Sequence, residues 1–279
     1  MIKRIISGFC LAALLSPAFY AGAQEAAPVK NKTIILATTT SVQDTGLLDV
    51  LVAAFQKGND YIVKAVAVGS GQAMQMGKAG EADLMWVHSP DDEIQFVAEG
   101  YGTDRTTFMH NDFVLLGPAA DPAKVKKEKK AAAAFAKIAA SGVQFVSRGD
   151  NSGTHKKELK IWGAAKVKPA ADKYIEAGQG MAATVKIADE KGAYVLADRS
   201  TYLSLRKNLS LKILCEGDEI LLNRYSLILV NPARFPKANA EGAKAFFDFL
   251  LSKRTKKIVD NFGVDKYGKK LFFYDYPAK

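Results

Sequence analysis

Short apolar runs alternate along this chain with segments of helical spacing, and polar turns separate the two. The run 32–37 predicts a buried strand, and Leu48, Leu51 and Phe55 then recur at the spacing of one helix face. A second apolar run at 62–68 predicts another strand, which a short helix follows. Because strand and helix alternate, we expect an α/β fold with mostly parallel sheets flanked by helices.

The same alternation continues through the second half of the chain. The expected elements there are, in order, a helix at 131–140, a strand at 143–147, a helix at 152–165, a helix after 178–181, a strand at 193–197 and a helix from about Arg199. The last long helix is expected at 240–257.

Two further strand-like runs, at 113–118 and 225–232, each end at a proline and lie far apart in the chain. The chain is longer than a usual single core requires, which suggests two lobes. We interpret the two runs as crossovers between these lobes. One lobe then comprises 31–114 together with 228–279, and the other comprises 115–227.

Three of the polar turns carry hydroxyl groups and glycines at a junction between strand and helix. They are 38–41 (TTTS), 69–72 (GSGQ) and 147–155 (SRGDNSGTH). In an open α/β sheet such turns converge outside the carboxyl ends of the strands, where ligands bind. The start of a helix exposes N–H groups without internal partners and carries a partial positive charge. The three turns together therefore predict an oxyanion site.

The turn at 147–155 has the most specific composition. Arg148 offers a fixed fork of donors, Ser152 and Thr154 offer hydroxyl groups, and the glycines let the backbone approach a ligand closely. A purely structural interpretation remains open at this point, in which Ser152 caps a helix and Arg148 pairs with Asp150.

Five segments in this order resemble the TupA-type tungstate-binding proteins of bacterial ABC importers: TTTSVQDTGLLDVL, VGSGQAMQMGKAGEADLMWVHSP, NDFVLLGP, SRGDNSGTHKKE and GQGM. The resemblance extends from Lys32 to Phe272. It implies a two-lobed periplasmic solute-binding fold of type II, which closes on a tetrahedral anion. It also implies a protein that delivers the anion to an inner-membrane permease, uses no cofactor and is not an enzyme.

The motifs divide between the two expected lobes, as a closing cleft requires. The expected ligands of the anion are Thr39, Ser41 and Ser70 from one lobe, and Arg148, Ser152, Gly153 and Thr154 from the other. Thr38, Thr40 and the turn at Gly180 are additional candidate donors.

Tungstate is the expected ligand, with molybdate next, and phosphate is the alternative. Phosphate keeps a proton on many molecules near neutral pH, so a selective phosphate site needs a buried acceptor such as a carboxylate. Phosphate-binding relatives of this fold have an aspartate near the end of the strand that corresponds to 83–87, where this chain has His88-Ser89-Pro90. This departure predicts a site built of donors, although Asp91 or Asp150 could turn inward.

Other classes of function fit the sequence less well. A secreted hydrolase could pair a histidine with a serine, but there is no nucleophile-elbow pattern, no H-E-x-x-H and no Cys/His cluster for a metal ion. The net charge of +10 would suit nucleic acid, yet no basic stripe is interleaved with aromatic residues. A positive field would instead draw in a small anion.

The N-terminus predicts export. A basic start at 1–4, an apolar core at 5–15 and small residues at 21–23 are typical of a secretory signal peptide, with cleavage after Ala23. The protein is therefore expected in the periplasm, as a monomer. Removal of this segment leaves Cys215 as the one cysteine, which excludes an internal disulfide.

Overall fold

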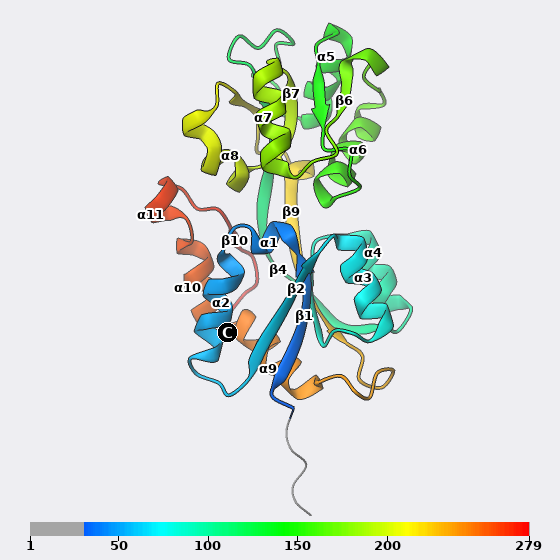
Figure 1. Cartoon of the computed structure of the whole chain (residues 1–279), viewed down its shortest axis with the longest axis vertical. Helices are drawn as coiled ribbons and strands as arrows, with labels where there is room; N and C mark the ends of the chain where they lie inside the picture. The colour runs from blue at the N-terminus through cyan, green and yellow to red at the C-terminus, as the bar shows by residue number, and fades with distance from the viewer. Residues whose placement is uncertain (1–30, 279) are drawn as a thin grey trace, which may run out of the picture. The chain divides into compact units, whose positions relative to one another are not determined.

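A sheet of ten strands forms the frame of residues 31–278, the part of the chain that the computed structural model describes (Figure 1). The strand order is β2 (Ile62–Val68), β1 (Thr33–Thr39), β3 (Leu84–Val87), β9 (Leu222–Val230), β4 (Gly102–Gly117), β7 (Tyr194–Asp198), β5 (Phe145–Ser147) and β6 (Tyr174–Glu176). The strands β8 (Lys212–Cys215) and β10 (Phe273–Tyr274) both pair with β4. The signal peptide expected at 1–23 lies outside the described residues.

The sheet is mixed, and two strands account for its antiparallel part. β1 pairs in parallel with β2 and β3, and β5 pairs in parallel with β6 and β7. Every antiparallel pair involves β4 or β9. The alternation of strand and helix is as expected, whereas the sheets are less uniformly parallel than the sequence predicts, because the two expected crossover strands pair with each other and with their neighbours.

The long strand β4 changes its partners part-way along its length. Its first part, through Asp112, pairs with β9, and its second part, from Phe113, pairs with β7 and β8. Figure 1 shows β4 and β9 side by side between the strands β1–β3 and the strands β5–β7. Both runs that the sequence marks as crossovers fall on these two strands.

Eleven α-helices flank the sheet within the described residues. They are α1 (Thr40–Gln43), α2 (Leu47–Gln56), α3 (Ser70–Ala79), α4 (Pro90–Ala98), α5 (Ala131–Ser141), α6 (Gly153–Ala165), α7 (Met181–Lys191), α8 (Arg199–Leu205), α9 (Ala240–Leu250), α10 (Lys253–Asn261) and α11 (Val264–Tyr267). Short 3-10 turns occur at Ala171–Lys173, Arg206–Asn208 and Glu219–Leu221. None of the helices in the described part of the chain is both long and apolar enough to cross a membrane.

The single helix expected at 240–257 is wrong, because the chain breaks it at Ser252. The hydroxyl of Ser252 donates to Phe249 O at 2.6 Å and accepts from Thr255 N at 3.2 Å. It therefore ends one helix and caps the next, α10. Apolar residues continue at helical spacing on both sides of the break, so periodicity alone does not reveal it.

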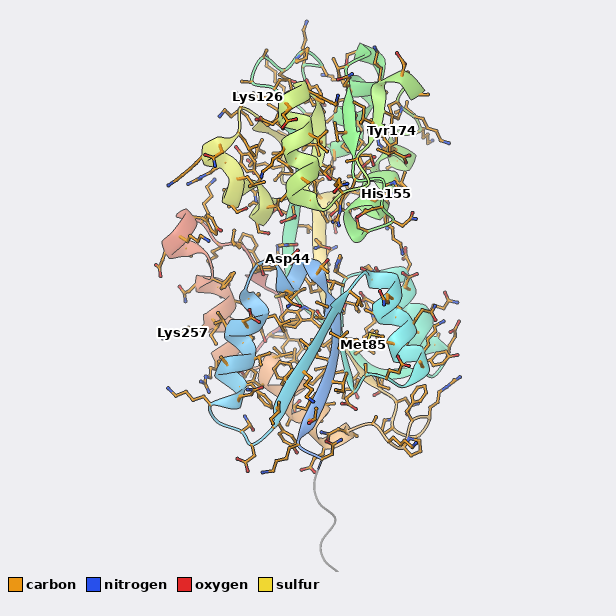
Figure 2. All side chains as sticks on the ribbon, in the orientation of Figure 1. Asp44, Met85, Lys126, His155, Tyr174 and Lys257 are labelled. Atoms are coloured by element: carbon orange, nitrogen blue, oxygen red, sulfur yellow. The ribbon has the colours of Figure 1, made fainter. Side chains whose placement is uncertain are left out.

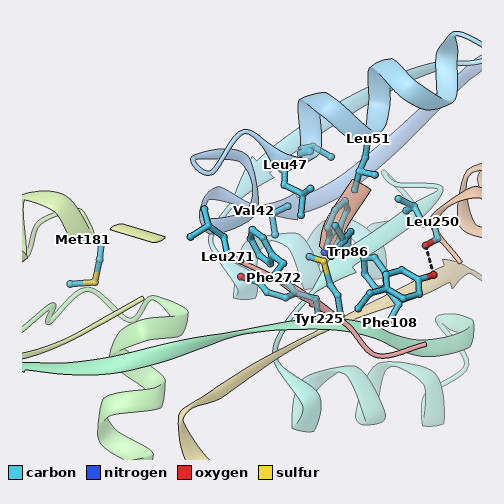
Figure 3. Packing of buried hydrophobic residues seen from close by; sticks show 14 of the residues in the cluster. Val42, Leu47, Leu51, Trp86, Phe108, Met181, Tyr225, Leu250, Leu271 and Phe272 are labelled. Carbon is cyan, nitrogen blue, oxygen red and sulfur yellow. Dashed lines mark hydrogen bonds between the residues drawn. The ribbon is translucent and has the colours of Figure 1, made fainter. Parts of the chain in front are cut away.

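The C-terminal segment completes the largest hydrophobic cluster (Figure 3). Trp86 meets Phe108 edge to face with 5.2 Å between ring centroids, and Phe108 meets Tyr274 at 6.2 Å. The Tyr274 hydroxyl also donates to Leu250 O at 3.0 Å. Because large aromatic side chains dominate the energetics of a core, this cluster ties β3 and β4 to the end of the chain.

A second aromatic cluster fixes the start of the 147–155 turn. Trp162 of α6 packs against Phe135 of α5 and Phe145 of β5, with ring centroids 4.5 Å and 5.2 Å away. Its indole N–H donates to the buried carboxylate of Glu158 at 3.0 Å, and Tyr174 donates to the same oxygen at 2.7 Å. The strand before the turn and the helix after it are therefore held by one packed cluster.

Cys215 is free and buried. Burial, with nearby acidic groups, raises the pKa of Cys215 to about 11. A thiol that stays protonated is a poor nucleophile.

Asp83 joins β3 to two segments that are far away in the sequence. Its Oδ2 accepts from Ile35 N of β1 at 2.7 Å, and its Oδ1 accepts from Asn239 N at 2.7 Å, just before α9. Asn239 in turn donates to Asn31 O and Thr33 O, both at 2.8 Å. These buried bonds fix the last third of the chain against its first strand.

We expect Asp83→Ala to destabilise the fold by about 3 kcal/mol, since it leaves two buried N–H groups without acceptors. Asp83→Asn keeps one acceptor and should lose less. Urea unfolding followed by circular dichroism measures both changes. The control is Asp60→Ala, whose carboxylate is 90% exposed and pairs with Lys32 on the surface. If the two alanine variants unfold at the same urea concentration, the junction does not stabilise the fold as described.

Candidate functional site

The three predicted turns open α1, α3 and α6, and the turn at Gly180 opens α7. The starts of these helices differ in whether a side chain caps them. Ser152 caps α6 by accepting from His155 N at 3.3 Å. The helices α3, after Gly69, and α7, after Gly180, have no side-chain cap. The N–H groups in their first turns therefore remain available to an external acceptor.

One cavity of about 250 Å³ lies where several of these elements meet. Its lining residues are Thr40, Asp44, Thr45, Phe113, Arg148, Thr154, Gly180, Met181, Asp198, Ser200, Thr201, Ser204, Lys266, Tyr267 and Leu271. The cavity thus brings together α1, the 147–155 turn, and the starts of α7 and α8 with α11. A tetrahedral oxyanion is small enough for such a space.

Arg148 is the main cationic group of this cavity that is not freely exposed. Its side chain is 18% exposed, and its Nε lies 2.9 Å from Asp150 Oδ2. The Nε atom is buried, and Asp150 Oδ2 is the charged group beside it. Asp150 also accepts from Ser152 N at 3.1 Å. The pairing of Arg148 with Asp150 is therefore real, and it leaves donors of the guanidinium for a ligand.

The other residues expected in the second lobe lie at different distances from the cavity. Thr154 is nearly buried and lines it. Ser152 is not among the lining residues and acts as the cap of α6. Gly153 lines a separate cavity beside His88.

The residues expected in the first lobe lie around the starts of α1 and α3. Thr39 and Ser70 are buried and do not line the cavity, whereas Thr40 does. Ser41 belongs to α1, and its side chain lies outside the described ones. Thr38 donates its hydroxyl to Trp86 O at 3.0 Å and so connects β1 to β3.

Two carboxylates line the cavity that sequence reasoning missed. Asp198 caps α8 and accepts from Thr201 N at 2.8 Å and from the Thr201 hydroxyl at 2.7 Å, and the Ser200 hydroxyl donates to it as well. Asp44 follows α1 directly (Figure 2). This cavity therefore carries acceptors as well as the donors that the sequence predicts.

The environment of Asp44 disfavours its charge. Partial desolvation raises the pKa of Asp44, the neighbouring Asp198 raises it further, and Arg148 opposes both effects. A signal for this residue was present in the sequence, because Asp44 follows the TTTS turn within the same segment.

His88 stands at the end of β3 and packs on the start of α6. A Cβ atom at Gly153 would lie 2.5 Å from His88 Cε1, so only glycine fits there without movement. The ring is partly exposed by area but closely surrounded by protein atoms, including Tyr225 at 5.1 Å between centroids. Desolvation, with nearby Lys157, lowers the pKa of His88 to about 4, which keeps the ring neutral at neutral pH.

The cavity beside His88 has a volume of about 720 Å³ and side chains of both signs. Lys157 lines it, and its ammonium donates to Ile220 O at 3.0 Å and Leu222 O at 2.9 Å. Desolvation, with Lys160 and Arg224, lowers the pKa of Lys157 to about 8. Lys156 and Asp92 approach to 3.6 Å across this space. Its basic groups are thus largely engaged with backbone carbonyl groups and carboxylates.

Proteins with similar sequences and folds are known. The PBP superfamily domain matches residues 22–254. The tungstate-binding protein TupA of Peptoclostridium acidaminophilum is 50% identical over 86% of this chain and 84% of its own length. This chain belongs to the TupA family.

Solved structures support the family and the fold. The tungstate-binding protein TupA from Desulfovibrio alaskensis G20 is 45% identical, with a TM-score of 0.79 over 88% of this chain and 99% of that one. The tungstate ABC transporter structure from Geobacter sulfurreducens is 43% identical, with a TM-score of 0.74 over 83% and 99%. The α/β fold of a type II periplasmic binding protein is therefore confirmed. These relatives are binding proteins of transporters, which confirms that the chain is not an enzyme.

Gly153→Ala should destabilise the fold by about 1–3 kcal/mol, because the added methyl group meets a packed ring. Removing the ring in the double variant with His88→Ala should recover part of this loss. Thermal unfolding of the two single variants and the double variant measures the coupling.

The matched control is Gly163→Ala in the same helix, where an added Cβ meets nothing within 4 Å. This variant should be as stable as the parent or more stable, since alanine favours helix. Equal stability of the Gly153 and Gly163 variants would contradict the His88 contact.

Proposed function

We propose that this protein is the periplasmic receptor of an ABC importer for a tetrahedral oxyanion, with tungstate as the first ligand and molybdate next. The observation that carries the proposal is Arg148, a largely buried guanidinium that lines a cavity beside the uncapped start of α7. The chain is half identical to a tungstate-binding protein, which supports the choice of anion. The receptor delivers its ligand to an inner-membrane permease.

In this proposal the anion is held by charge, hydroxyls and backbone N–H groups. The guanidinium of Arg148 supplies charge-assisted hydrogen bonds, which are stronger than neutral ones. Thr154 adds a hydroxyl from the same side, and the first turn of α7 adds N–H groups. Ser152 and Gly153, which lie next to Thr154 in the chain, contribute through the Ser152 hydroxyl proton and the backbone when the site closes.

The opposite side of the site comes from the other lobe. We propose lobes of 31–114 with 228–279 and of 115–227, and the change of partners along β4 between Asp112 and Phe113 supports a hinge there. Thr39, Ser41 and Ser70 lie at the ends of β1 and β2 and reach the anion when the lobes close. Binding then selects a closed state through contacts that the open state lacks.

The setting of the receptor follows from the same proposal. The protein acts in the periplasm after removal of residues 1–23, as a monomer, without a cofactor and without nucleic acid. The described residues contain no group of three or more His, Cys, Asp or Glu side chains that could hold a metal ion.

Calorimetric titration of the protein without residues 1–23 tests the ligand class. Tungstate should bind tightly, molybdate close behind it, and phosphate and sulfate far more weakly. Since Asp44 could accept a proton from hydrogen phosphate, equally tight phosphate binding would overturn the proposal in favour of a phosphate receptor.

Small-angle scattering of the same samples adds a control for closure. Tungstate should reduce the radius of gyration and raise the melting temperature, because ligand stabilises the state that binds it. If heat is released but neither quantity changes, binding occurs without the proposed cleft.

Arg148→Ala should weaken tungstate binding roughly ten- to hundredfold, as expected for charge-assisted hydrogen bonds of about 1.5–3 kcal/mol. Arg148→Lys should recover only part of the affinity, since an ammonium cannot reproduce the planar fork. The matched control is Arg254→Ala, an exposed residue of α10 that does not line the cavity. Unchanged affinity in Arg148→Ala would reduce Arg148 to a partner of Asp150.

A further inference from the structure

The charged side chains that line the small cavity balance each other. Arg148 and Lys266 are cationic, and Asp44 and Asp198 are anionic. Arg148 is in addition paired with Asp150. A dianion seated in this cavity would therefore add two negative charges that no lining side chain offsets. Helix N-termini stabilise an anion, but each offers only about half a charge.

The two carboxylates are not equivalent. Asp198 receives hydrogen bonds from Ser200 and from the backbone and side chain of Thr201, so its oxygens already have donors. Asp44 receives none at its side chain from any residue that the structure describes, and it is exposed at the cavity wall. Of the two carboxylates, Asp44 is therefore the one whose oxygens an entering anion would meet directly.

The groups facing Asp44 come from three elements of the cavity. They are Asp198 at the start of α8, Arg148 from the 147–155 turn, and Lys266 with Tyr267 from α11. Partial desolvation and Asp198 already raise the pKa of Asp44, against the effect of Arg148. A bound anion would displace water from Asp44 and would also share the Arg148 charge that now stabilises its ionised form. Both changes raise the pKa of Asp44.

We propose that Asp44 takes up one proton from solvent when a dianionic oxyanion binds, and that its neutral carboxyl group then donates an O–H hydrogen bond to the ligand. This inference rests on the proposed function. The proton bonds to a carboxylate oxygen of Asp44, and the complex gains one negative charge instead of two. Asp44 thereby determines specificity, because it changes from an acceptor, which repels a proton-free anion, to a donor.

Proton linkage fixes the sign of the pH dependence. A group whose pKa is higher in the complex than in the free protein binds a proton on association, so affinity increases as pH falls between the two pKa values. The affinity should increase by up to about tenfold per pH unit within this interval. Above and below this interval the affinity should not depend on pH.

The test is titration with sodium tungstate in two buffers that differ in ionisation enthalpy, at each of several pH values between about 6 and 8. The difference in heat gives the number of protons bound. The wild type should take up a fraction of a proton that approaches one. Asp44→Asn should still bind tungstate, with no proton uptake and a flat pH profile.

The matched control is Asp49→Asn, an exposed aspartate of α2 outside the cavity, which should behave as the wild type. Protonation of tungstate itself is common to all three proteins and cancels in their comparison. Asp44→Ala provides a second variant, and the wild-type pH profile tests the inference even if neither Asp44 variant folds.

The outcomes separate the inference from the proposed function. Tight tungstate binding without proton uptake overturns the inference alone, as does uptake that persists in Asp44→Asn. Absence of tungstate binding to the wild type overturns the proposed function and the inference with it. Proton uptake that is lost only when Asp44 is replaced supports both the inference and the proposed function.

Discussion

The antiparallel pairing of β4 with β9 is the constraint on which the rest of the structure depends. These are the only described strands through which the parallel group β1–β3 continues into the parallel group β5–β7. Each group ends in helix starts, and their turns meet at the cavity around Arg148. In the proposed function, a ligand that contacts both groups acts on the residues where β4 changes partners, which is where the hinge is proposed.

Hydrophobic spacing predicted those parts of the fold that depend on local sequence. The helix face read from Leu48, Leu51 and Phe55 is buried in α2, and the run 62–68 is β2 without change. The break at Ser252 was missed because a serine on a helical pattern has the same appearance whether it lies within a helix or caps one. The strand partners of β4 and β9 could not be predicted from the sequence, since strand pairing depends on residues far apart in the chain.

The candidate site shows the same division. Arg148 and Thr154 were predicted for the site and line the cavity, because a turn of glycines and donors before a helix is a local signal. Asp198 was missed since it serves α8 as a cap, and only the approach of α1 places it opposite Asp44. Glycine is required at 153 because the ring of His88, which follows β3, packs against the start of α6. Contacts between distant segments thus account for most of what the sequence could not show.

The contacts of Asp83 and β3 with distant segments also bear on the rate at which the chain folds. Asp83 and Asn239 are 156 residues apart, and β3 has β9 as its neighbour on one side. The first strands can pair with each other early, but β3 cannot be covered on that side until the distant β9 arrives. Closing such a long loop costs entropy before the contact stabilises anything, which slows folding. The protein should therefore refold slowly from denaturant, with a long interval in which the edge of β3 is open to pairing with other chains.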